Sequence, residues 1–191
     1  MKVVAFNGSP KPRGNTAQAL EAVLSELRKE KIDTELVQLS EKKIYGCRGC
    51  RKCIEMKNRR CIRTDDDVNQ LIEKMLEADG IIFGSPVYVS NVTSELKALI
   101  DRSCFVAKAN NFMFKGKVGA PVVVATNAGT NFAYSAINLM FGISQMITIG
   151  STHWNLALGK QPGDILKDEE GMKSLEVLGQ NLAWLLKKLH G

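Results

Sequence analysis

The sequence predicts an α/β protein built on a doubly wound parallel sheet of about five strands. Three apolar runs, at residues 3–6, 80–84 and 118–125, are each followed by a polar loop and then by apolar residues at helical spacing. Continuous apolar runs suit strands that are covered on both faces. Because such strands are joined by right-handed crossovers, the three polar loops fall at one edge of the sheet, where ligands of these folds bind.

The 191-residue chain has a uniform composition with 45% hydrophobic residues, which predicts a single domain over residues 1–191. Residues 40–64 form a cysteine-rich insertion in it, after the second strand. No apolar run approaches the ~18 residues of a membrane helix, and Asn7 interrupts the N-terminal run before it reaches the length of a signal peptide. We therefore expect a cytoplasmic protein with no membrane partner, whose thiols are reduced unless they hold a metal.

The first apolar run leads into a loop, residues 7–16, that is suited to binding an anion. The loop combines glycines, prolines, two cations and hydrogen-bonding side chains, and it precedes a helix. A helix N-terminus offers free backbone N–H groups and a favourable dipole to a phosphate. The spacing of Gly8 and Gly14 matches neither the Walker nor the dinucleotide fingerprint. An ordinary turn is the alternative, and Lys11 and Arg13 favour the phosphate site.

The remaining elements follow in chain order from the apolar spacing. An amphipathic helix over 16–29 precedes a more polar strand at 34–39, which we expect at a sheet edge. A helix begins after Thr64 and the acidic residues 65–67 and ends near residue 80, and further helices cover 93–107 and about 133–144. A short strand between 147 and 158 and a helix near 175–189 complete the chain. One phosphate loop and about five strands favour the order 2-1-3-4-5 and a mononucleotide ligand.

The insertion carries four of the five cysteines. Cys47, Cys50 and Cys53 stand at three-residue intervals, and Cys61 follows. A compact triplet of thiolates with a fourth from a flexible loop is the pattern of a [4Fe–4S] cluster. Structural zinc, which usually takes two separated Cys-x-x-Cys pairs, and free thiols are the alternatives. We expect Cys104, on a predicted helix, to pack in the core.

The same region holds the chain's excess positive charge. Residues 47–63 contain seven cations against one acid, and the net charge of the chain is +6. No aromatic side chain lies among them to stack on bases, so we expect no nucleic-acid partner. The cations would offset the negative charge of a cluster and attract an acidic redox protein such as a ferredoxin.

Four motifs together resemble the flavodoxin-like family of FMN-dependent NAD(P)H reductases: GSPKPRGNT at 8–16, SPVY at 85–88, LK at 96–97 and DR at 101–102. The resemblance covers nearly the whole chain and implies a flavodoxin-like fold that binds FMN. It implies that the phosphate is held by Ser9, Lys11, Arg13, Gly14, Asn15 and Thr16. It places along the isoalloxazine Pro86, Val87, Tyr88, Val89 and Asn91, and at the ring edge Asn127, Ala128, Gly129 and Thr130. Lys11 stands where relatives often carry arginine. Lysine keeps the positive charge but cannot donate a pair of parallel hydrogen bonds to the phosphate.

The cysteine triplet after the second strand is similar to that of the iron–sulfur flavoproteins of anaerobic archaea and bacteria, which carry FMN and a [4Fe–4S] cluster in one chain. This resemblance implies an oxidoreductase that couples a one-electron carrier, such as ferredoxin, to a small-molecule electron acceptor. The cofactors carry the redox chemistry, so no catalytic side chain is assigned. Two alternatives stay open: an NAD(P)H-dependent FMN or quinone reductase with structural zinc, and a redox- or iron-sensing binding module.

The predicted topology separates the two cofactors. The cysteines follow an outer strand, whereas FMN binds at the switch between the first and third strands. We therefore expect a homo-oligomer, a dimer or tetramer, in which the cluster approaches the flavin of a neighbouring subunit.

Overall fold

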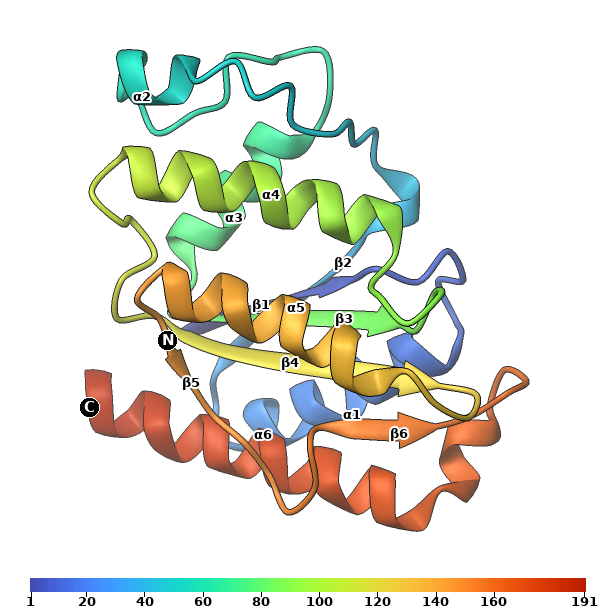
Figure 1. Ribbon diagram of the computed structural model, residues 1–191. Helices are drawn as coiled ribbons and strands as arrows, with labels where there is room; N and C mark the ends of the chain where they lie inside the picture. Colours follow the sequence, from blue (N-terminus) through green and yellow to red (C-terminus); the bar gives the residue numbers. More distant parts are fainter.

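A computed structural model, which describes all of residues 1–191, contains a six-stranded parallel sheet (Figure 1). Strands β1 (Lys2–Asn7), β2 (Asp33–Gln38), β3 (Gly80–Pro86) and β4 (Val118–Ala125) follow the order β2-β1-β3-β4. Next to β4 lie two short strands, β5 (Ile147–Thr148) at its beginning and β6 (Leu156–Leu158) at its end. The predicted order 2-1-3-4-5 is confirmed, and its fifth position is divided between these two strands.

Helices cover both faces of the sheet (Figure 1). One face carries α1 (Asn15–Lys29) and α6 (Glu169–His190), and the other carries α3 (Val68–Glu77), α4 (Ser94–Ala109) and α5 (Thr130–Ile143). Successive side chains of a strand point to opposite faces. Val3 and Ala5 of β1 accordingly pack toward α1 and α6, whereas Val4 and Phe6 pack toward α3, α4 and α5. The alternation gives two apolar cores, one on each side of a buried sheet.

The cysteine-rich insertion lies on the outer side of α4, away from the sheet (Figure 1). It is less irregular than the sequence suggests, because it begins with a 3-10 helix, η1 (Leu39–Glu41), and contains a short helix, α2 (Lys52–Met56). A second 3-10 helix, η2 (Asp164–Lys167), precedes α6. No helix has both the length and the apolar character that crossing a membrane requires.

Candidate functional site

The three polar loops meet at the carboxyl edge of the sheet, because β1, β3 and β4 are parallel. A cavity of about 180 Å³ opens there. Of the predicted FMN residues, those that line it are Ser9, Lys11, Gly14, Asn15, Thr16, Pro86, Val87 and Tyr88. Those that do not are Arg13, Val89, Asn91, Asn127, Ala128, Gly129 and Thr130. The structure thus gathers the phosphate loop and the start of the second loop around one space.

The backbone of the first loop is held tightly against β3. The Gly8 N–H donates to the Gly84 carbonyl at 2.8 Å, and a Cβ at Gly8 would lie 2.9 Å from that oxygen. Further along, the Lys11 N–H donates to Ser9 Oγ at 3.1 Å. Gly14 then caps α1 without a side-chain hydrogen bond. The first-turn N–H groups of α1 therefore lack a side-chain acceptor, which is the arrangement that binds a phosphate.

Asn15 uses its side chain within the protein. Its Nδ2 donates to the Gln161 carbonyl and its Oδ1 accepts from the Gly163 N–H, both at 2.8 Å. The predicted phosphate contact of Asn15 is therefore left to its backbone N–H. The same two bonds bring the loop after β6 to the cavity, where Lys160 adds a cation that the sequence analysis missed. The sequence could have indicated this cation, because a Gly-Lys-x-Pro segment at 159–162 directly follows the last strand.

The second loop makes a tight turn beside the cavity. The backbones of Tyr88 and Asn91 exchange hydrogen bonds of 2.8 and 2.9 Å, and Val89 and Ser90 between them have φ values of 47° and 59°. Gly129 of the third loop, at φ 85°, packs on this turn, and a Cβ there would lie 3.0 Å from Val87 Cγ1. The third loop thus lines the cavity only at its start, through Thr126, and its residues 127–130 support the second loop from behind.

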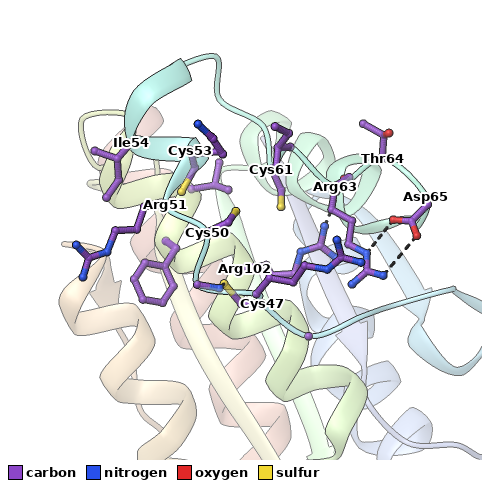
Figure 2. Close-up of a pocket in the computed structure, with 17 residues that line it drawn as sticks. Cys47, Cys50, Arg51, Cys53, Ile54, Cys61, Arg63, Thr64, Asp65 and Arg102 are labelled. Carbon is purple, nitrogen blue, oxygen red and sulfur yellow. Dashed lines mark hydrogen bonds and ion pairs between the residues drawn. The ribbon is translucent and has the colours of Figure 1, made fainter.

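A larger cavity, of about 720 Å³, lies between the insertion and α4. Figure 2 shows the sulfur atoms of Cys47, Cys50, Cys53 and Cys61 around this space. No three histidine, cysteine, aspartate or glutamate side chains are grouped so as to hold a single metal ion. The four thiols instead surround a volume, as the ligands of a polynuclear cluster do. Cys104 lies outside it, packs against the core and has its Sγ 4.0 Å from Ser144 Oγ.

Hydrogen bonds hold both ends of the insertion. On the N-terminal side, the Tyr45 N–H donates to Asp66 Oδ2 at 3.1 Å. On the C-terminal side, buried Asn69 accepts from the Cys61 N–H at 2.8 Å and donates to the Cys61 carbonyl at 2.9 Å. The acids at 65–67, expected to serve the helix N-terminus, thus anchor the insertion as well. Cys61 and Cys53 are half-buried, whereas Cys47 and Cys50 are exposed.

Arg102 of α4 forms the floor of this cavity with Phe105 and Val106. Its side chain is 1% exposed and pairs through Nη1 with Asp66, whose side chain is 0% exposed. Burial lowers the pKa of Arg102, but hydrogen bonds with Asp66 and Cys61 outweigh it and raise that pKa above its usual value. Arg102 Nε is buried and has no hydrogen-bond partner. A buried cation with a free donor, beside four thiols, fits an anionic metal–thiolate group.

Burial changes the pKa of two cysteine thiols. Burial raises the pKa of the Cys53 thiol, and the neighbouring Cys61 and Cys47 act in the same direction. Burial likewise raises the pKa of Cys104. A metal ligated by Cys53 must therefore displace a proton from it.

Residues 47–63 of the insertion keep more than half of their seven cations unpaired. Three of the seven cations are paired with acids, as Lys52–Glu55, Arg60–Glu73 and Arg63–Asp65. The other four are exposed and have no carboxylate partner: Arg48, Arg51, Lys57 and Arg59. These four exposed cations, here called the cationic rim of the insertion, give it a positively charged surface.

The chain is similar to flavin reductases and to iron–sulfur flavoproteins. Residues 1–161 match the family model for NADPH-dependent FMN reductases. An iron–sulfur flavoprotein of Methanocaldococcus jannaschii is 37% identical over 194 residues, covering 98% of each chain. An iron–sulfur flavoprotein of Methanosarcina thermophila is 31% identical, covering 98% of this chain and 96% of its own. Among solved structures, a flavone reductase superposes with a TM-score of 0.74 at 18% identity, over 99% of this chain and 64% of the other.

Proposed function

The chain belongs to the NADPH-dependent FMN reductase family and to the iron–sulfur flavoproteins within it, and from this premise we propose that it transfers electrons between a [4Fe–4S] cluster and FMN. The observation that carries the proposal is the cavity lined by Cys47, Cys50, Cys53 and Cys61 together with Arg102, a buried arginine whose Nε has no hydrogen-bond partner. FMN exchanges two electrons in single steps and the cluster exchanges one at a time, so the pair links one-electron carriers to two-electron reactions.

The residues at the sheet edge have separate tasks in FMN binding. The free N–H groups at the start of α1 hold the phosphate, with Ser9 and Thr16 beside them and with Lys11 and Lys160 supplying charge. Arg13, outside the cavity lining, adds to the positive potential of this loop. The turn of the second loop and the loop 127–130 behind it border the isoalloxazine.

The position of the two cavities supports transfer between subunits. The FMN loops meet the N-terminal end of α4, where Thr93 Oγ1 donates to the Gly8 carbonyl at 2.8 Å. The cysteine cavity lies on the outer side of the same helix at Arg102, about 14 Å further along its axis at 1.5 Å per residue. Because α4 separates the two sites within one chain, we propose a homo-oligomer that brings each cluster to a neighbour's flavin.

The exposed cationic rim supports an acidic redox protein, such as ferredoxin, as the electron donor, with a small molecule as the acceptor. The matched family model favours a second candidate, NADPH. Supplying each donor alone distinguishes the two, and steering of ferredoxin by the rim is screened at high ionic strength. We expect ferredoxin to reduce the flavin at a rate that falls steeply with salt.

Analysis of anaerobically purified protein tests the cofactor assignment. We expect FMN together with four iron atoms and four sulfides per chain, the content of one [4Fe–4S] cluster. Cys61→Ser should lose iron and sulfide but keep FMN. Cys104→Ser, which removes a thiol outside the cavity, is the matched control and should keep both cofactors. Stoichiometric zinc without sulfide would overturn the cluster and leave a flavin reductase with a structural metal.

A further inference from the structure

We propose that Arg102 tunes the cluster: its Nε donates a hydrogen bond to the sulfur-rich group held in the cavity and so raises the reduction potential of that group, while Asp66 keeps the guanidinium in place. The inference rests on the proposed [4Fe–4S] site and goes beyond it, because Arg102 is not a ligand.

Both terminal nitrogens of Arg102 have partners within the protein, and Nε is the nitrogen that has none. Nη1 donates to Asp66 and to the Tyr45 carbonyl at 3.1 Å, and Nη2 lies 3.5 Å from the Arg63 carbonyl. Nε has no partner although it is buried. Buried N–H donors are almost always paired, since leaving one unpaired is costly. The acceptor that the protein does not supply is expected from the group that Arg102 faces, among the sulfurs of Figure 2.

Asp66 prevents Arg102 from turning away. Its side chain is fully buried, pairs with Arg102, and also accepts from the backbone N–H of Tyr45 at 3.1 Å and of Val68 at 3.3 Å. If the carboxylate moved together with the guanidinium, it would lose these two hydrogen bonds from backbone N–H groups. The pair links the residues before Cys47 and after Cys61 to α4, and it fixes the Nε donor at the cavity floor.

We expect Arg102 to affect the reduction potential of the cluster more than the exposed cations do. One-electron reduction adds a negative charge to the cluster, and a hydrogen bond to its sulfur stabilises the more negative form. The cations of the rim are exposed, so solvent and salt screen them. Arg102 is buried, where screening is weaker. Because Asp66 already balances its charge, the effect belongs to the N–H donor rather than to net charge.

The test is a redox titration of three variants beside the wild type, followed by electron paramagnetic resonance. Arg102→Gln removes the cation and its Nε, and Arg102→Lys keeps a cation for Asp66 but removes the Nε donor. Arg60→Gln removes an exposed cation next to Cys61 that pairs outside the cavity with Glu73. At a fixed potential, we expect both Arg102 variants to shift the ratio of oxidised to reduced cluster about tenfold toward oxidised, about 59 mV for one electron. Arg60→Gln should shift it less than about threefold.

Arg102 variants that keep full iron and sulfide and the wild-type potential would overturn the proposal. For variants that lose the cluster, a second measurement decides: wild-type protein carrying arginine labelled with ¹⁵N at Nε should show a nitrogen coupling to the reduced cluster in pulsed resonance. Absence of that coupling would reject the role of Arg102. Wild-type protein without iron and sulfide would instead reject the cluster assignment itself, so the two failures are distinguishable.

Discussion

Val89 adopts a left-handed backbone at the tip of the turn between Tyr88 and Asn91. For a β-branched residue this conformation is an outlier, with a cost of about 1–2 kcal/mol. Its side chain is fully exposed, so burial within the chain does not repay that cost. The strain is held by the Tyr88–Asn91 backbone pair and by Gly129 packed behind the turn.

Replacing Val89 by asparagine should therefore stabilise the protein. Asparagine tolerates the left-handed region, so we expect the free energy of unfolding to rise by about 1 kcal/mol. Thermal unfolding followed by circular dichroism measures the change. Val89→Ile keeps the β-branch and should give no gain. Equal melting temperatures for Val89→Asn and Val89→Ile would show that the turn carries no strain.

The contacts of some single residues could not be predicted from the sequence. The composition of the first loop indicated a phosphate site, and the structure gathers most of that loop around one cavity. The sequence did not indicate that the Asn15 amide binds residues 161 and 163, or that Asp66 pairs with Arg102. Amides and carboxylates suit many partners, and these contacts join residues far apart in the chain. Their roles follow from the folded arrangement alone.

At the scale of elements, α1 and α6 cross closely at Gly179. A Cβ at this position would lie 2.6 Å from the Val23 carbonyl oxygen, which belongs to the backbone of α1 and cannot move cheaply. Beside it, Glu26 is nearly buried and bonds to Lys29 and Gln180. The Lys29 hydrogen bond is the main cause that holds the pKa of Glu26 below its ordinary value.

Gly179→Ala should destabilise the protein, although alanine is the better helix former. The change gains about 1 kcal/mol in helix propensity, whereas overpacking costs about 1–3 kcal/mol. Because the clash involves backbone, we expect a net loss of about 1 kcal/mol, seen as a melting temperature lower by about 2–4 °C.

Gly142→Ala in α5 is the matched control. Nothing lies within 4 Å of a Cβ there, so this variant should gain up to about 1 kcal/mol. A Gly179→Ala variant as stable as Gly142→Ala would contradict the close crossing of α1 and α6.

The long apolar elements could be predicted, and the short ones could not. Strands β1, β3 and β4 are apolar because they are buried on both faces. Strand β2 is more polar because it lies at the edge of the sheet. Helix α2 has five residues between left-handed Arg51 and Lys57, too short for a periodic signal. The division between β5 and β6 depends on Ser151 and Asn155, which are held through Ser174 of α6, a contact between distant parts of the chain.

For the whole molecule, the central feature is two separate cavities, one at the carboxyl edge of the sheet and one on the outer side of α4. Topology alone predicted their separation, because the insertion follows an outer strand and FMN binds at the switch point. The buried floor of the cysteine cavity could not be predicted, since it requires α4 and the residues on both sides of the insertion to meet. If each cluster serves a neighbour's flavin, an isolated subunit holds both cofactors and still cannot pass electrons between them efficiently.

Mixed oligomers test this arrangement directly. Cys61→Ser chains should hold FMN without a cluster, and Lys11→Glu chains should hold a cluster while the new carboxylate repels the FMN phosphate. Each variant alone should fail to carry electrons from reduced ferredoxin to flavin. Chains of the two variants expressed together with different tags and purified through both should regain part of the activity. In such an oligomer, the Lys11→Glu cluster faces the flavin of the Cys61→Ser chain. Mixed oligomers as inactive as their parents, or a wild-type monomer that transfers rapidly, would place the transfer within one chain.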